Sequence, residues 1–472
     1  MATITSAGLG SGLNVEELVA KLVSLERTPI TQLTKRTDGL KTELSAFGKV
    51  QSALSTLRDA ANKLTSPSSW AGTLATSSDP TSVSVTAGEG AAIGNLSVEV
   101  QALAQSQTLV GSTTYTNAAS TVGQGSLTIT LGSWGANNAS FTDKAGATPI
   151  TVNIGPGQDT LTGIRDAINA AGAGVTASII NDASGARLSL RSTTSGAANG
   201  FRIESTGGLA DLSYDPRVGV SSLTQTLPAQ NARALINGIE VSSESNTLKA
   251  AIDGLNITLL KQTTFPASIA VTQDKDSIKK LITDFTTAYN AVNALLREQT
   301  KYDAGSNTAG ALQGDSTANG LQAQLRGIIG GATTLGGTMN RLAQIGLDPG
   351  SDGNIKLSET KLNTSLNDLD SLKQMFMGLD TGDDSNNGFA QRMRSFIDGA
   401  LGTEGAVSSR QAGLKKLIDN NNKRSDQLED RVALTEARLR ARYTALDTQM
   451  AKLNGLSNYV SQQLSTLNLN GN

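Results

Sequence analysis

An apolar repeat at each end of the chain is the feature that most constrains its fold. From Leu33 to Leu64, apolar residues recur in steps of three, four or seven, and from Leu428 to Leu467 they recur in steps of three or four, with Thr435 as the one polar member. Such spacing places side chains on one face of an α-helix, as in a coiled coil. A single stripe of this kind most often packs on its own domain. Because two stripes occupy the two ends of one chain, we predict that they pair with each other.

A shorter helix is predicted before the first repeat. Asn14 is a favourable N-cap, Glu17 holds the capping-box position, and Leu13 and Leu18 are spaced to form a hydrophobic staple. Pro29 ends this helix and begins the next, because proline suits the first turn of a helix and disrupts its interior. The leucines of the short helix form its predicted packing face: Leu18, Leu22 and Leu25.

Charge is distributed unevenly along the chain. Residues 71–271 carry 22 charged side chains, whereas residues 272–472, a stretch of the same length, carry 44. Helices laced with ion pairs are rich in charge, while sheets faced with Thr, Ser and Gly need little of it. We therefore predict a mainly β middle between two helical parts.

Alternation of apolar and polar residues supports strands in this middle part. Six runs have the period of two that is typical of strands: 83–86, 96–100, 127–131, 150–154, 186–190 and 255–259. Turn signals separate the runs at three places: Asn199-Gly200, Asn237-Gly238 and Asp253-Gly254. One helix interrupts the strands, with Asp159 or Thr160 as its cap and Gly172 at its end. Its predicted buried face is Leu161, Ile164 and Ile168.

The last part of the chain is predicted to be helical. A helix over 276–300 is followed by a glycine-broken stretch over 327–346 and by further helices to residue 397. The first of these helices has an apolar stripe: Ile278, Leu281, Ile282, Phe285, Tyr289, Val292 and Leu296.

The composition excludes several classes of chemistry. The chain has no Cys and no His, which rules out disulfides, thiolate nucleophiles, Cys/His zinc sites and Ser-His-Asp triads. Aromatic residues make up 3%, and because large ligand pockets are usually lined with aromatics, this argues against a small-molecule enzyme. A net charge of −2 gives no electrostatic reason to expect nucleic-acid or membrane binding. We predict no catalytic residue, no cofactor and no metal.

Segments that direct proteins to or across membranes are not found. No apolar run reaches 18 residues, so no transmembrane helix is expected. Residues 1–13 have neither the basic nor the apolar region of a Sec signal peptide. We therefore expect a protein that is cytosolic or is exported by a route that recognises another signal.

Four segments come close to known ligand sites without matching them. Residues 348–359 nearly match an EF-hand calcium loop, but a glycine at its third position favours an Asp-Gly hairpin followed by a helix N-cap. Residues 383–388 would place an arginine at the twelfth position of such a loop, so a solvated loop is predicted. The glycines of 8–12 lack the flanking strand of a phosphate loop. Asp211 and Asp215 lack the aromatics that stack a sugar in a glycosidase.

Sequence segments along nearly the whole chain share their order and placement with one known family. These segments are 6–14, 18–23, 26–29, 235–239, 245–247, 251–255, 285–290, 312–315, 442–443, 450–454 and 459–464. Together they resemble the flagellar hook-associated protein 2 family, the filament cap proteins. Residues 160–203 resemble the insertion module shared by flagellins and hook-associated proteins.

The resemblance implies a multidomain α+β fold, in which terminal helices pair as a coiled coil, a helical leg follows, and a mainly-β head of two domains is inserted. The predicted N-terminal part is 1–70, a flexible segment with coiled-coil helices. The β head domain is discontinuous, 71–107 with 229–271, and 108–228 is inserted in it. The helical leg is 272–410, and the C-terminal coiled-coil helix is 411–472.

The resemblance also implies a structural role and not an enzyme. Such a cap forms a small ring, commonly taken as five subunits, at the distal tip of the flagellar filament, where it retains exported flagellin and promotes its polymerisation. Its implied partners are its own copies, flagellin, a cytosolic export chaperone and the flagellar export apparatus. The alternatives are a hook–filament junction protein, a flagellin-like protein, or a tip adhesin that binds host glycans; an enzyme is the weakest class.

Two sets of residues are predicted to carry this role. The coiled-coil and assembly set is Leu18, Leu22, Leu25, Leu33, Leu40, Leu44, Phe47, Leu54, Leu57, Leu428, Val432 and Leu439. The resemblance assigns chaperone or partner binding to the closing helix, at Tyr443, Leu446, Met450, Leu453, Tyr459 and Leu464. We expect residues 1–64, and those from about 414 onward, to become ordered only in the assembled cap or against a chaperone.

Overall fold

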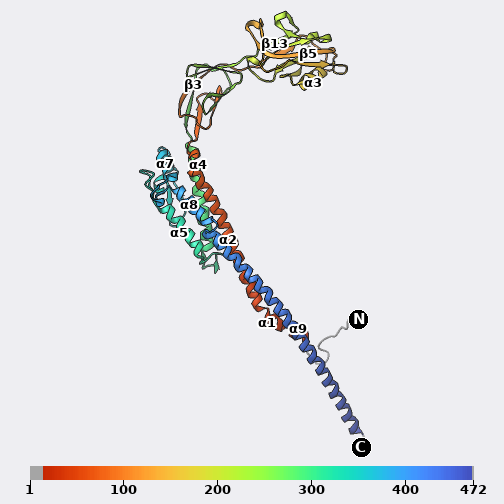
Figure 1. Cartoon of the computed structure of the whole chain (residues 1–472), viewed down its shortest axis with the longest axis vertical. Coiled ribbons are helices and arrows are strands. Elements are labelled where there is room, and N and C mark those ends of the chain that lie inside the picture. Colours follow the sequence, from red (N-terminus) through yellow and green to blue (C-terminus); the bar gives the residue numbers. More distant parts are fainter. Residues whose placement is uncertain (1–13, 470–472) are drawn as a thin grey trace. The chain divides into compact units, whose positions relative to one another are not determined.

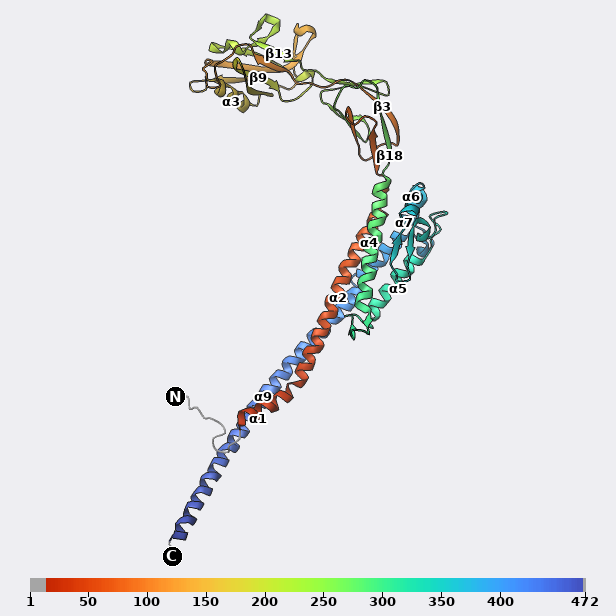
Figure 2. The same ribbon diagram turned by 180° about the vertical axis from the view of Figure 1, so that it is seen from behind.

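The structure is a computed structural model that describes residues 14–469. These residues form two compact units: a helical unit, made of the described residues up to Trp70 together with those from Asp276 onward, and a β unit from Ala71 to Lys275. Figures 1 and 2 show the ribbon of the units from opposite sides. Helices at both ends and sheets in the middle confirm the predicted α+β fold class.

One part of the β unit contains a five-stranded and a three-stranded antiparallel sheet. The strand orders are β1-β18-β3-β14-β15 and β16-β17-β2. Their buried side chains form one hydrophobic cluster, which includes Val98, Ile257 and Ile269. The bounds are β1 Thr73–Ser77, β2 Val83–Ala87, β3 Gly94–Ala102, β14 Ala232–Ile236, β15 Ile239–Ser243, β16 Thr247–Ile252, β17 Leu255–Leu259 and β18 Ala267–Gln273.

The other part of the β unit has its own hydrophobic cluster, which includes Leu127, Ile164 and Phe201. A six-stranded sheet has the order β12-β11-β10-β5-β6, with β7 also paired to β5, and a four-stranded sheet has the order β13-β4-β9-β8. The bounds are β4 Thr108–Gly111, β5 Gly125–Trp134, β6 Phe141–Asp143, β7 Ile150–Ile154, α3 Leu161–Ala171, β8 Val175–Asp182, β9 Gly185–Ser192, β10 Gly200–Ser205, β11 Tyr214–Asp215, β12 Val220–Ser221 and β13 Leu223–Leu227.

Local sequence signals determine most of these strand ends. All six predicted strands are present, as β2, β3, β5, β7, β9 and β17. Asn237-Gly238 joins β14 to β15 with φ of 51° and 81°, the two positive values of a type I′ turn, and Asp253-Gly254 joins β16 to β17. The signal at Asn199-Gly200 does separate two strands, β9 and β10, but it forms no hairpin turn. Asn199 ends a short 3₁₀ helix and Gly200 begins β10, because the Asn199 side chain donates to the Ser195 carbonyl and holds the helical turn.

The one predicted helix of the β unit is confirmed in its cap and its end. Thr160 is the N-cap, and its hydroxyl accepts from the Gly163 N–H at 3.1 Å. Gly172 ends α3 in the left-handed region at φ 63°, which glycine adopts without strain. The predicted face of α3 is fully buried: Leu161, Ile164 and Ile168.

Eight helices and two small hairpins make up the described helical unit. The helices are α1 Val15–Glu26, α2 Thr28–Thr65, α4 Lys275–Thr300, α5 Ser316–Gly330, α6 Glu359–Ser365, α7 Leu369–Met377, α8 Phe389–Leu401 and α9 Ala406–Leu469. The hairpins pair β19 Tyr302–Asp303 with β20 Thr308–Ala309, and β21 Leu347–Pro349 with β22 Ile355–Leu357. The predicted glycine-broken stretch begins too early, because Gly327 lies inside α5. Among residues 14–469, we find no helix whose length and hydropathy suit a bilayer-spanning segment.

The main core of the helical unit contains half of the first apolar repeat. The apolar residues of the repeat from Phe47 to Leu64 are buried in one cluster with side chains of α4, α5, α7, α8 and α9, including Leu414. The predicted coiled coil therefore ends where Phe47 enters this core, because several helices supply apolar surface to the same stripe. Burial in the chain's own core argues that Phe47–Leu64 and Leu414 are ordered without an outside partner, and the expected ordering only in the assembled cap or against a chaperone stays a prediction.

The segment that nearly matched a calcium loop is a hairpin seated on α4. The Tyr289 hydroxyl donates to the Gly353 carbonyl at 3.0 Å, and the Asn290 side chain exchanges two hydrogen bonds with the backbone of Ile355. Ser358 then occupies the N-cap of α6, as predicted. Within the described part of the chain, no group of carboxylates is arranged to hold a metal ion. Burial raises the pKa of Tyr289 to about 12.

Candidate functional site

The two ends of the chain meet as antiparallel helices. Arg440 of α9 pairs with Glu16 of α1 at 2.6 Å, and Arg27, which joins α1 to α2, pairs with Glu429 at 3.1 Å. As the residue number rises along α1, the number of the contacting residue on α9 falls, so the two helices are antiparallel. The predicted pairing of the terminal helices is confirmed, since α9 packs along both α1 and α2.

A hydrophobic cluster lies along the same pair of helices. Its buried members are Val15, Val19, Val23, Ile30 and Val432, and its half-buried members are Leu428, Leu439 and Tyr443. The predicted leucine face of α1 is wrong, because Leu18 is 37% exposed and Leu25 is 70% exposed, while Val19 is 1% exposed. The leucines and the valines of α1 both have helical spacing. Packing against α9 determines that the valines are the buried row. Valines at steps of four were the available signal.

The other predicted assembly residues divide among different surroundings. Half-buried positions along α2 are Leu33, Leu40 and Leu44, of which Leu40 and Leu44 pack against the main helical core. Fully buried positions in the main helical core are Phe47, Leu54 and Leu57. Members of the hydrophobic cluster of the coiled coil are Leu428, Val432 and Leu439. The set therefore combines core residues with true helix-pair residues.

The start of α1 follows its predicted cap. The Asn14 side-chain oxygen accepts from the Glu17 N–H at 3.1 Å. The staple partner Leu13 lies outside the described residues, so the staple stays a prediction. Pro29 lies in the first turn of α2, but Arg27 keeps helical angles, φ −79° and ψ −13°, and α1 and α2 follow each other almost without a break.

The distal part of α9 exposes an apolar face. Beyond the start of α1, no described element lies beside α9, as both ribbon views show (Figures 1 and 2). The exposed apolar side chains, here called the distal stripe, are Leu446, Met450, Leu453, Leu456, Tyr459, Val460 and Leu464. Only Asp447 and Lys452 are charged between residues 444 and 465. An exposed, nearly neutral apolar helix face is typical of a surface that another helix or groove covers.

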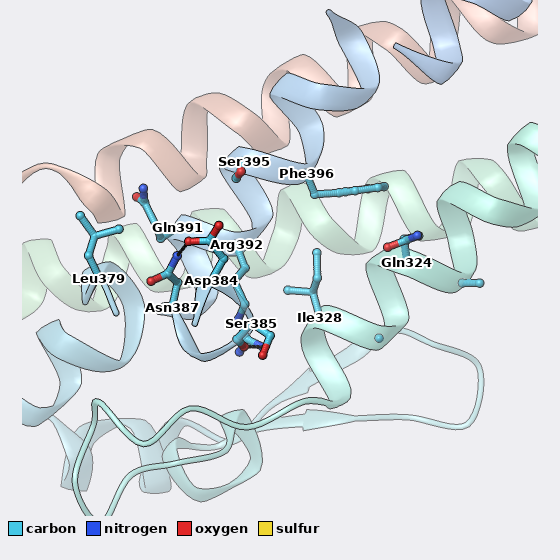
Figure 3. Close-up of a pocket in the computed structure, with 12 residues that line it drawn as sticks. Gln324, Ile328, Leu379, Asp384, Ser385, Asn387, Gln391, Arg392, Ser395 and Phe396 are labelled. Carbon is cyan, nitrogen blue, oxygen red and sulfur yellow. Dashed lines mark hydrogen bonds between the residues drawn. The ribbon is translucent and has the colours of Figure 1, made fainter. Parts of the chain in front are cut away.

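A cavity of about 730 Å³ lies between α5, α8 and the loop of residues 379–387 (Figure 3). Arg392 lines it, with its guanidinium 4.6 Å from the centre of the Phe389 ring and its Nη1 donating to the Ser385 carbonyl at 3.0 Å. Its Nε and Nη2 are buried and have no hydrogen-bond partner among the described residues, and burial lowers its pKa. The sequence offered no signal for this cavity, because its walls are separate in the chain.

Two of the remaining candidate sites are held in local ion pairs and hydrogen bonds. Asp215 pairs with Arg217 at 2.6 Å, and the hydrogen bond from Arg217 holds the Asp215 pKa below its usual range, while Asp211 accepts from the Thr113 hydroxyl. Residues 383–388 form a turn held by their own side chains. The glycines of 8–12 lie outside the described residues.

Comparisons with known proteins match nearly the whole chain. Residues 11–107 match the flagellar hook-associated protein 2 N-terminus and residues 229–455 its C-terminus. Residues 138–194 match the flagellin hook IN motif, which overlaps the module predicted over 160–203.

Individual relatives and a solved structure agree with these family matches. Flagellar hook-associated protein 2 of Escherichia coli strain K12 is 31% identical over 98% of both chains, and that of Salmonella typhimurium is 29% identical over 99% of this chain and all of its own. The crystal structure of the D1-D2-D3 domains of the flagellar cap protein FliD from Escherichia coli superposes with a TM-score of 0.59 at 31% identity, over 78% of this chain and 99% of that one. These matches do not favour a junction protein, a flagellin or an adhesin. The chain belongs to the flagellar hook-associated protein 2 family, the flagellar cap proteins.

Proposed function

We propose that this chain caps the distal tip of a bacterial flagellar filament, where it retains exported flagellin and promotes its polymerisation. The observation that carries the proposal is the match along almost the full length to hook-associated protein 2, together with the match over 78% of the chain to a solved flagellar cap protein. The role is structural and not enzymatic. Its test is deletion of the gene in the source bacterium. We expect monomeric flagellin in the medium and no filaments, with rescue by the wild-type gene; normal filaments after deletion would contradict the proposal.

The proposed cap is a small ring of five copies. It is seated on flagellin after passage through the flagellar export apparatus. A closed ring on a helical lattice cannot make the same contact at every subunit. Segments that touch the filament must therefore adapt, and the distal stripe has no fixed partner in the described chain. Native mass spectrometry of the purified cap measures the subunit number, and a closed species of another size would contradict the ring of five.

The distal stripe is the proposed binding surface for a cytosolic export chaperone before secretion. Its residues follow helical spacing, so a groove can accept them as anchors. Burying one such side chain is worth about 1.5–3 kcal/mol, so Leu446→Asp with Leu453→Asp should weaken binding several tens-fold. Calorimetric titration against the chaperone measures this change.

A matched control separates the stripe from a general effect of charge. Thr444→Asp with Ala451→Asp adds the same charges at the same seven-residue spacing on the other side of α9, where both positions are exposed. We expect the control to bind the chaperone within about twofold of wild type. Equal binding by the stripe variant and the control would contradict a chaperone site here.

We propose that the β unit consists of two domains. One is discontinuous and is formed by residues 71–107 together with 229–271, and the other, 108–228, is inserted in it. The two separate hydrophobic clusters support this division. The chain enters and leaves the inserted part side by side, since Gln105 and Gln230 exchange backbone hydrogen bonds. Deleting 108–228 and joining the ends should leave a cooperatively melting protein with β signal. Loss of all β signal would contradict the division.

A further inference from the structure

One flank of the α1–α9 pair combines exposed leucines with unpaired arginines. The leucine row of α1 is Leu18, Leu22 and Leu25, of which the first and last are exposed. The arginine row of α9 is Arg431, Arg438 and Arg442, all exposed. None of these three arginines forms an ion pair with another residue of the described chain, whereas Arg440 and Arg27 on the same helices do.

The two rows lie on the same flank. Helical residues advance by about 100°, so Glu16 and Arg27 lie about 60–80° to one side of Val19 and the leucine row lies about 60–120° to its other side. On α9, Glu429 and Arg440 lie about 60–80° to one side of Val432, and the arginine row lies about 80–120° to its other side. The ion pairs join the side of α1 that carries Glu16 and Arg27 to the side of α9 that carries Glu429 and Arg440. The leucine row and the arginine row therefore adjoin along the opposite flank.

The rows are also in register along the helices. The ion pairs place Glu16 level with Arg440 and Arg27 level with Glu429. The same antiparallel register puts Leu18 level with Arg438, and Leu25 level with Arg431. Leu18 and Leu25 thus each lie beside an arginine, and these two leucine–arginine steps are seven residues apart on both helices, which is one heptad.

We propose that this flank docks a third helix, an acidic amphipathic helix of a partner protein. Heptad-spaced leucines accept apolar a and d side chains, and heptad-spaced arginines pair with carboxylates at the flanking e or g positions. A second copy is not favoured as the occupant, because the distal stripe that it would offer carries only one carboxylate, Asp447. An anionic lipid surface would attract arginines without requiring a seven-residue repeat on two helices.

The test uses the full chain and a labelled synthetic three-heptad peptide with Leu at a and d and Glu at e and g. Fluorescence anisotropy measures its affinity. Arg431→Glu with Arg438→Glu should weaken binding about tenfold or more, as should Leu18→Ala with Leu25→Ala. The matched control is Lys416→Glu with Lys423→Glu, which are exposed, also seven residues apart and on the outer side of α9; it should bind within about twofold of wild type.

Further arms distinguish charge recognition from other causes. A peptide with Lys in place of Glu should bind about tenfold less tightly, and added salt should weaken the Glu peptide. Helix content and melting of each variant are followed by circular dichroism. Both should match wild type, because every mutated side chain is exposed and the half-buried Leu22 is left unchanged. Equal binding by arginine variant and control overturns the proposal. Binding of phosphatidylserine vesicles that depends on the arginines, without peptide binding, overturns it in favour of a lipid surface.

Discussion

Helix α9 carries the apolar repeat from Leu428 onward, yet the two halves of this repeat have different surroundings. From Leu428 to Tyr443 the repeat packs on α1 and on the start of α2, and before it Leu414 packs on the main helical core. From Leu446 to Leu464 its apolar members are 36–59% exposed. The repeat thus predicts a helix and its apolar face equally well in both halves. It identifies the partner of that face only where the chain itself supplies one.

The largest expected difference between the halves is in the stability of the helical unit. Leu414→Ala should lower its free energy of unfolding by about 2–5 kcal/mol, because Leu414 is fully buried and its removal leaves a cavity. Leu453→Ala, at an exposed position of the same helix, should change it by less than about 0.5 kcal/mol. Denaturant unfolding followed by circular dichroism measures both. Equal losses would mean that the distal half is also packed in the free protein.

A second prediction concerns the faces of α1. Val19→Ala should loosen the contact of α1 with α9 by about 1.5 kcal/mol, since it removes two buried methyl groups. Leu25→Ala is the control on the exposed leucine row. Hydrogen exchange of α1 amides should accelerate in the valine variant and stay close to wild type in the leucine variant. Faster exchange in the leucine variant than in the valine variant would support the leucine face that was predicted from spacing.

Two tyrosines extend the comparison to a polar contact. Tyr289→Phe should cost about 1 kcal/mol, because it removes the buried hydrogen bond to Gly353, whereas Tyr459→Phe on the distal stripe should cost nothing measurable. Unfolding of the two variants by denaturant measures the difference. A loss for Tyr459→Phe as large as that for Tyr289→Phe would indicate an ordered contact in the distal half.

The Tyr289 phenol also makes stability depend on alkaline pH. Burial raises its pKa to about 12, above the ordinary value of 10.0. Between these values the unfolded chain loses the proton while the folded chain keeps it. This contribution is therefore complete below pH 10.0 and is lost as the pH rises to about 12. The stability advantage of wild type over Tyr289→Phe should therefore shrink as the pH rises through this range, and unfolding curves of the two proteins measure it.

The smallest expected effect belongs to the ion pairs at the proximal half of α9. Glu16→Gln removes the contact with Arg440 and should cost at most about 0.5 kcal/mol, because both side chains are about half exposed. Added salt should reduce even this difference. A cost above about 1 kcal/mol would mean that the ion pair, more than the valine cluster, holds α1 on α9.

Predictions made from short sequence intervals succeeded where the deciding contact was equally local. Thr160 caps α3 through a neighbouring backbone N–H, and Asn237-Gly238 turns a hairpin through its own dihedral angles. The prediction for Leu18, Leu22 and Leu25 failed because two rows of α1 have acceptable spacing and a distant helix selects one. The cavity beside Arg392 could not be predicted, since its walls come from segments far apart in the chain.

The sequence by itself determined the helical ends, the β middle, the caps and the tight turns, because each depends on the period of apolar residues or on groups within one turn of each other. It also determined that the distal stripe is apolar. Only the tertiary structure decided that Phe47–Leu64 belongs to a multi-helix core, that valines face α9, and that the distal stripe has no partner among residues 14–469. The physical reason is that burial depends on which remote surfaces meet, and periodicity along one helix carries no information about them.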